Sequence, residues 1–279
     1  MIERRRVLVV GVGSPNPEFL VKTLRMNGVP AERTDKIRAP NPFLIRKFDV
    51  VYGIYLQSCS RYIIVAKMLR KRTAIHFVGS DAYWFAREKS LIRRAYWRMV
   101  LRLTDSIFYV SPHLEELTKR KGTILPLPIA VDSYKAAPLG SLRPERDVLY
   151  YCPSGIENER IYRLSWILEY AESHPEEKIT IVGNSSHPAR YKLDLPNVLV
   201  VPFVEMEKMP EFYRKHKRLI RMTTEDGLPQ MIHEAFLSGV EVTFNGVEIQ
   251  DVPKEREPSY FASIFKTTLG INVGERLRS

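Results

Sequence analysis

The chain of 279 residues carries 43 Lys and Arg against 32 Asp and Glu, a net charge of +11, and 44% of it is hydrophobic. This length fits two domains of roughly 130 residues, and the apolar content excludes a disordered chain. No apolar run approaches the roughly 20 residues of a membrane span. The two cysteines, Cys59 and Cys152, lie far apart and in no zinc-site spacing, so we expect a protein of the reducing cytoplasm that binds no metal.

The charge is unevenly distributed along the chain. Residues 1–140 hold 25 Lys and Arg and 11 Asp and Glu, a net charge of +14, whereas residues 141–279 have 18 and 21, a net charge of −3. An excess of this size in one half favours an anionic partner. This partner could be a nucleic acid, an anionic lipid surface or a phosphorylated acceptor.

Short apolar runs alternate with helical patterns in the first half. The runs VLVV and SIFYV are apolar throughout, which is typical of parallel strands covered on both faces. The alternation predicts a doubly wound α/β domain. It places strands at 7–12, 50–55, 74–78 and 106–110, and helices at 18–27, 61–70 and 89–103.

A proline-rich segment, 126–147, indicates a connection between domains, because proline removes backbone donors and interrupts helices. The α/β pattern then resumes. We therefore expect a Rossmann-like domain at 1–138, a second at 139–258, and a C-terminal helix and tail at 259–279. The second half predicts strands at 148–152, 178–182, 198–202 and 218–222, and helices at 160–173, 209–216, 230–238 and 259–269.

The segment TTEDGLPQMIHEAFLSGVEV, 223–242, carries two acidic residues separated by seven positions, Asp226 and Glu234. Gly227 permits a tight or positive-φ turn, and Pro229 suits the first position of a helix. A helix N-terminus that faces a ligand is an anion site, and Glu234 is placed to reach hydroxyls near that anion. A nucleotide sugar offers both groups, whereas a plain strand–turn–helix with solvated acids is the alternative.

This segment resembles the motif of retaining glycosyltransferases of the GT-B fold, family-4 type, in which two glutamates are separated by seven residues. Asp226 stands in place of the first glutamate. The resemblance implies that Asp226 contacts the donor sugar, with the neighbouring Glu225 able to serve instead, and that Glu234 holds the nucleotide ribose. It assigns Gly227 and Leu228 to the same donor site.

The segment HFVGSDAYW, 76–84, resembles the family's strand-end loop on the acceptor side, which implies that His76 and Asp81 lie near the reacting groups. A simple Gly-Ser-Asp turn is the alternative. The likeness continues in order through 106–132, 179–184 and 196–227, and so covers nearly the whole chain. It implies an α/β protein with two Rossmann-like domains whose parallel sheets face each other across a cleft.

The diphosphate region departs from the family pattern. Ser154 and Gly155 stand where members carry Gly-Arg, and Arg160 is near the family's lysine. We expect Arg160 to grip the diphosphate, the alternative being a solvated first-turn residue. Arg221 is a second candidate cation, and Gly13, in a loop after the first strand, is a further donor-site candidate.

The helix predicted at 89–103 combines two kinds of side chain. One interpretation is a helix that packs on the sheet and exposes its cationic face to solvent. The other is a peripheral contact with an anionic membrane surface, with arginines for head groups and a tryptophan for the interface. The expected apolar face contains Leu91, Ile92, Ala95, Tyr96, Met99, Val100 and Leu103, and the opposite face Arg93, Arg94, Trp97, Arg98 and Arg102.

Together these features favour a retaining, metal-independent glycosyltransferase. It would move a sugar from a nucleoside-diphosphate sugar, its co-substrate, to a glycan or a lipid-linked acceptor, with no other cofactor. The alternatives are a binding protein of the same fold with an eroded site and a nucleotide-sugar epimerase of the same fold. A nucleic-acid-binding protein ranks below them, because no recognition motif is present. The cytoplasm, with or without attachment to the inner face of the membrane, is the expected location.

Overall fold

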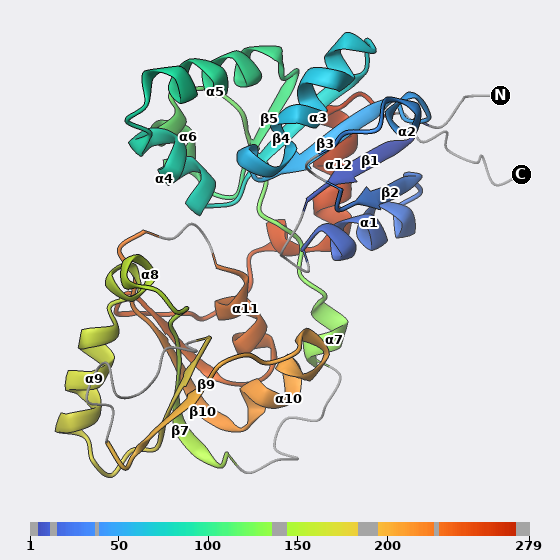
Figure 1. The fold of residues 1–279 in the computed structure, drawn as a ribbon. Coiled ribbons are helices and arrows are strands. Elements are labelled where there is room, and N and C mark those ends of the chain that lie inside the picture. The colour runs from blue at the N-terminus through green and yellow to red at the C-terminus, as the bar shows by residue number, and fades with distance from the viewer. Residues whose placement is uncertain are drawn as a thin grey trace, which may run out of the picture. The chain divides into compact units, whose positions relative to one another are not determined.

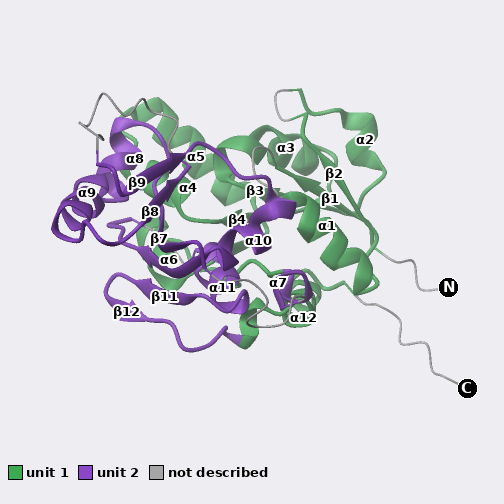
Figure 2. Ribbon diagram, turned by 90° about the horizontal axis from the view of Figure 1, so that it is seen from below, with its two compact units in different colours: residues 1–129, 254–279 green, residues 130–253 purple. Residues whose placement is uncertain are grey.

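The computed structural model describes residues 5–11, 16–36, 39–135, 144–183, 195–225 and 229–271. It divides into two compact units (Figure 2). Unit 1 consists of residues 1–129 and 254–279, and unit 2 of residues 130–253. The division thus comes after residue 129, where the sequence analysis placed it after 138, and the C-terminal segment belongs to unit 1.

Unit 1 contains a six-stranded sheet in the order β2-β1-β3-β4-β5-β6, with every pair parallel (Figure 1). Its continuous apolar strands are buried, as that pattern predicts. The strands are β1 (Val7–Val10), β2 (Ala31–Thr34), β3 (Val50–Ile54), β4 (Arg72–Phe77), β5 (Ser106–Tyr109) and β6 (Thr123–Ile124).

The C-terminal helix of the chain completes the core of unit 1. Phe265 packs edge-on against Tyr52 at 4.9 Å between ring centroids and stacks on Phe108 at 5.8 Å. Arg256, fully buried, donates a hydrogen bond to the carbonyl of Leu127 at 2.9 Å. The helices of this unit are α1 (Asn16–Met26), α2 (Pro42–Arg46), α3 (Leu56–Met68), α4 (Ser80–Arg87), α5 (Leu91–Leu103), α6 (Pro112–Thr118), the 3-10 helix η3 (Lys254–Arg256) and α12 (Pro258–Thr268).

Unit 2 contains a second six-stranded sheet in the order β12-β11-β10-β7-β8-β9, parallel except for β12. Strand β10 pairs with β7 on one side and β11 on the other. The elements are α7 (Val131–Lys135), β7 (Arg146–Tyr151), α8 (Ile156–Ile161), α9 (Leu164–Ser173), β8 (Ile179–Val182), β9 (Val198–Val201), η2 (Met206–Lys208), α10 (Met209–Arg214), β10 (His216–Arg221), α11 (Gln230–Leu237), β11 (Glu241–Phe244) and β12 (Val247–Glu248).

The helix predicted at 160–173 is in fact two helices, α8 and α9. They are separated at Tyr162 and Arg163, and Arg163 has a left-handed backbone with φ 46°. The hydroxyl of Tyr150, from β7, donates a hydrogen bond to the carbonyl of Tyr162 at 2.6 Å. A contact from the preceding strand therefore stabilises a break that helical periodicity alone does not reveal.

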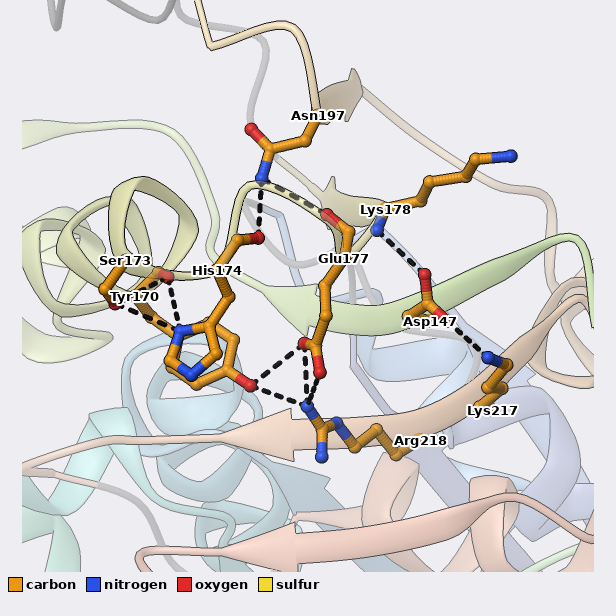
Figure 3. A network of polar contacts seen from close by, with 9 residues as sticks. All are labelled: Asp147, Tyr170, Ser173, His174, Glu177, Lys178, Asn197, Lys217 and Arg218. Carbon is orange, nitrogen blue, oxygen red and sulfur yellow. Dashed lines mark hydrogen bonds and ion pairs between the residues drawn. The ribbon is translucent and has the colours of Figure 1, made fainter.

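Two ion pairs join the amino ends of the unit 2 strands (Figure 3). The Arg218 guanidinium lies 2.7 Å from the Glu177 carboxylate, which also accepts a hydrogen bond from the Tyr170 hydroxyl at 2.9 Å. Asp147 pairs with Lys217 at 2.6 Å. These contacts join β7 and β10 to the turn before β8 and lie at the end of the sheet opposite to the carboxyl ends of its strands.

Replacement of Tyr150 by Phe removes the hydroxyl that supports the α8–α9 break. The partly buried carbonyl of Tyr162 then loses a hydrogen bond, and we expect the free energy of unfolding to fall by about 1–2 kcal/mol. Urea unfolding followed by tryptophan fluorescence measures this, because Trp166 stacks on Tyr150. Unchanged stability would show that the break forms without the hydroxyl.

Candidate functional site

The carboxyl ends of β7 and β10 form the candidate site in unit 2. The two strands are neighbours and parallel, so the loops that follow Tyr151 and Arg221 begin at the same edge of the sheet. Open α/β sheets bind ligands at this edge. Several of the residues expected to bind the donor follow these strands.

Arg221, the last residue of β10, is a buried cation in contact with two aromatic rings. Its guanidinium carbon lies 4.8 Å from the ring centroid of Tyr151 and 4.9 Å from that of Tyr162, and the side chain is 4% exposed. One guanidinium nitrogen lies 2.9 Å from the sulfur of Met231, in α11. The two rings are perpendicular to each other with centroids 5.5 Å apart, so they contact the guanidinium from adjacent directions and hold it in place. A guanidinium held in this way suits bidentate contact with phosphate.

Arg160 and Glu225, both expected to bind the donor, lie together. Arg160 donates to Glu225 at 3.1 Å and to Glu157 at 2.7 Å. The Glu225 side chain is 7% exposed, whereas that of Arg160 is 55% exposed. A phosphate would therefore have to compete with two carboxylates for Arg160, and Glu225 is engaged in an ion pair.

The turn between β7 and α8 is held by its own hydrogen bonds. Gly155 adopts φ 115°, a backbone conformation that L side chains rarely adopt. Asn158 donates to the carbonyl of Ser154 at 2.8 Å, and the Ser154 amide donates to the carbonyl of Gly183 at 3.2 Å. Ser154 and Gly155 thus form a fixed turn at the same edge as Arg221.

Glu234 is oriented by two buried tyrosines. The Tyr213 hydroxyl donates to one of its carboxylate oxygens at 3.0 Å, and the Tyr134 hydroxyl also hydrogen-bonds the carboxylate. Burial, followed by the negative charge of Glu234, raises the pKa of both tyrosines above the usual value. The three residues come from α7, α10 and α11. Sequence analysis did not find the tyrosines, since no spacing connects positions 134 and 213 with 234.

Four of the expected donor-site residues, Gly13, Asp226, Gly227 and Leu228, lie outside the described residues. Helix α11 begins at Gln230, directly after Pro229. The predicted helix of the acidic motif is therefore present in nearly the expected range.

His76 lies in the core of unit 1, although the sequence analysis placed it near the reacting groups. It is fully buried, and its Nδ1 lies 2.5 Å from the hydroxyl of Tyr52. Burial, the main cause, lowers the pKa of His76 to about 3, so the ring is neutral at physiological pH. Because its side chain packs among aromatic residues and does not reach the surface, its position supports packing and not contact with a substrate.

Asp81 connects two loops at the carboxyl edge of the unit 1 sheet. One carboxylate oxygen accepts the amides of Val78 and Gly79 at 3.1 and 3.2 Å, and the other accepts the amide of Leu56, at the start of α3, at 3.3 Å. The residue is 2% exposed. Burial raises the pKa of Asp81 to about 6, while these hydrogen bonds act in the opposite direction. In the structure Asp81 therefore shapes loops at this edge.

The raised pKa of Asp81 predicts a specific pH dependence of stability. Between its usual pKa of 3.8 and about 6, the folded state binds the proton more tightly than the unfolded state. The associated stabilisation is complete below the unfolded pKa and is lost as the pH rises through the folded pKa. The shift corresponds to about 3 kcal/mol.

The Asp81→Asn variant, which does not titrate there, tests this prediction by urea unfolding from pH 4 to pH 7. We expect the free-energy difference between the two proteins to change by about 2–3 kcal/mol across this range. The other acidic groups are common to both proteins and cancel. A difference independent of pH would contradict the assignment.

The amphipathic pattern of α5 was assigned to the wrong faces. Val100 and Leu101 are buried, and Tyr96 and Trp97 pack partly against the core with ring centroids 4.8 Å apart. Trp97, expected on the cationic face, thus belongs to the packed side, because it pairs with Tyr96 over the core. The expected apolar face includes residues that are instead exposed, namely Leu91, Ile92, Ala95 and Met99.

The arginines of α5 are mostly at the surface. Arg93, Arg98 and Arg102 are exposed. Arg94 is half-buried and donates to the carbonyl of Glu88 at 2.6 Å. The cationic character expected of this helix is present, and it occurs beside exposed apolar side chains.

Two features are absent from the described part of the chain. No cluster of three or more His, Cys, Asp and Glu side chains there is arranged to hold a metal ion. No helix there has the length and apolar character to cross a bilayer.

Comparison with known proteins gives structural likeness without sequence likeness. No family model matches the chain, and no curated protein matches it. Anabaena Alr3699/HepE, solved in complex with UDP and glucose, superposes with a TM-score of 0.63 at 13% identity, over 96% of this chain and 92% of that one. Sucrose-phosphate synthase from Thermosynechococcus elongatus gives 0.61 at 13% identity, over 96% and 90%.

A third neighbour is an alpha-glucosyltransferase in complex with UDP and a 13-mer DNA. It superposes with a TM-score of 0.61 at 10% identity, over 95% of this chain and 89% of that one. These likenesses extend over nearly the whole chain in both units. The chain therefore has the GT-B fold, with two α/β units built on predominantly parallel sheets, which confirms the predicted fold class.

Proposed function

We propose that this protein is a glycosyltransferase that moves a sugar from a nucleoside-diphosphate sugar to a glycan or a lipid-linked acceptor. The observation that carries the proposal is the arrangement around β10 and α11. It combines a buried arginine at a strand end with a glutamate oriented by two tyrosines, Arg221 and Glu234. The fold supports it, since two proteins of the same fold, HepE and the alpha-glucosyltransferase, were solved in complex with UDP.

In this proposal Glu234 accepts hydrogen bonds from the ribose hydroxyls. Its carboxylate is held in place by Tyr213 and Tyr134, which reduces the entropy lost on binding. Asp226, with the backbone of Gly227 and Leu228, contacts the donor sugar. The nucleotide is thus bound by the segment whose sequence resembles the donor motif.

The leaving diphosphate is stabilised by positive charge. Arg221 is oriented before the ligand arrives, and Arg160 joins it by exchanging its ion pair with Glu225 for one with phosphate. The amino end of α11 adds the positive end of its helix dipole. Stabilisation of the leaving group's charge is a large contribution to catalysis in transfer reactions. Because protein cations supply it here, the transfer we propose is metal-independent, and we propose that it is also retaining.

Glu234→Ala tests the nucleotide site. A ligand at about 100 times its Kd adds about 2.7 kcal/mol to the free energy of unfolding. We expect UDP to raise the midpoint of thermal unfolding of the wild type, and this rise to be lost in Glu234→Ala. GDP, ADP and dTDP identify the preferred base.

Glu241→Ala, an exposed acid in β11, is the matched control and should keep the shift. No shift of the wild type with any nucleotide would contradict a donor site. If UDP still raised the unfolding midpoint of Glu234→Ala, another residue would have to bind the ribose.

Tyr213→Phe tests whether Glu234 is oriented by its tyrosines. Loss of one hydrogen bond of about 1 kcal/mol should weaken nucleotide binding roughly 5-fold. We expect the loss for UDP but not for 2′,3′-dideoxy-UDP, which lacks the ribose hydroxyls that Glu234 would bind. Calorimetric titration of both ligands measures it, and equal losses would assign Tyr213 a purely structural role.

One observation favours a second candidate, a nucleotide-binding protein without transferase activity. Arg160 is neutralised by Glu157 and Glu225, at the position where the family pattern requires a free cation. Mass spectrometry of the UDP-sugar after long incubation distinguishes the two. Release of UDP, by transfer or by slow hydrolysis, supports the enzyme, whereas binding without turnover supports the second candidate.

A further inference from the structure

A basic hollow of about 600 Å³ lies in unit 1 among α4, α5 and α6, separate from the donor site of unit 2. Its lining has one acidic residue, Glu116, and several apolar ones. The basic residues of the lining are Arg94, Arg98, Arg102, Lys119 and Arg120. Five cations against one carboxylate in a concave site raise the local concentration of anions.

Among the described residues, the cations of the hollow have no carboxylate partner. On α5, the basic lining residues recur at intervals of four and form one stripe, Arg94, Arg98 and Arg102. Within the described part of the chain, Arg98 and Arg102 make no hydrogen bond or ion pair, and Arg120 donates to the carbonyl of Leu101 at 3.2 Å. Side chains directed into a hollow without carboxylate partners are available to an external anion.

Exposed apolar side chains accompany this charge. Leu91 and Ile92, in the first turn of α5, are 77% and 84% exposed, and Met99 is 43% exposed. In α4, Trp84 is 72% exposed and adjoins Phe85, which lines the hollow. These side chains belong to two of the helices that line the hollow, and large apolar side chains exposed to water are typical of an interaction surface.

We propose that this surface of unit 1 docks on an anionic phospholipid membrane. The arginines and lysine of the hollow bind the phosphates of the head groups, while Trp84, Leu91 and Ile92 enter the interfacial layer. A nucleic acid would satisfy the cations but would leave those apolar side chains in water, so the combination favours lipid. The inference does not depend on the proposed transferase activity.

Co-sedimentation of the full chain with phosphatidylcholine vesicles, with and without phosphatidylglycerol, tests the proposal. We expect binding only to the anionic vesicles. Arg98→Glu with Arg102→Glu should weaken it at least about 30-fold, since each basic residue near an anionic surface contributes about a factor of five. Leu91→Ser with Ile92→Ser should also weaken it, without any change in charge.

The control pair is Lys22→Glu with Lys47→Glu, which makes the same change of charge at exposed positions of unit 1 outside the hollow. It should retain most of the binding, and circular dichroism confirms that each variant is folded. Absence of binding, or equal loss in the control pair, would overturn the proposal. A different result would assign the surface to nucleic acid. In that case the protein would show no preference for anionic vesicles and would bind duplex DNA, and this binding would depend on Arg98 and Arg102 but not on Leu91 and Ile92.

Discussion

Parallel pairing of β10 with β7 is the constraint on which the unit 2 site depends. Because the two strands run in the same direction, Tyr151 and Arg221 reach the same edge of the sheet, where the ring of one covers the guanidinium of the other. The second ring, Tyr162, follows from the break between α8 and α9, which Tyr150 of the same strand supports. Strand direction, helix break and buried cation are thus parts of one arrangement.

Much of the fold could be predicted because strongly apolar strands and periodic helices dominate it. The strands predicted at 50–55 and 106–110 are present as β3 and β5, shortened by one residue each. Strand β2 was missed, because its two central residues, Glu32 and Arg33, are exposed at the sheet edge and give no apolar run. Strand β11, next to the short edge strand β12, is similarly short and polar at its start. Edge strands are stabilised by their neighbours more than by their own composition.

The site was only partly predictable, for a different reason. Spacing along the chain found Glu234 and Arg221, because they belong to one strand–loop–helix segment. It could not find Tyr134 and Tyr213, whose contact with Glu234 depends on three elements meeting. It also placed His76 and Asp81 near the reacting groups, whereas both side chains are buried. A local pattern identifies the type of a residue but not the depth at which its side chain lies.

Unit 2 is inserted between two portions of unit 1, since the chain leaves unit 1 after residue 129 and returns at residue 254. This order has a consequence for synthesis on the ribosome. Tyr52 and Phe108 are made before unit 2, but their partner Phe265 is made after it. Domains commonly fold in order from the N-terminus, yet here the core of unit 1 remains open until all of unit 2 has been synthesised. Unit 2 can therefore reach its native state before unit 1, whose chain it interrupts.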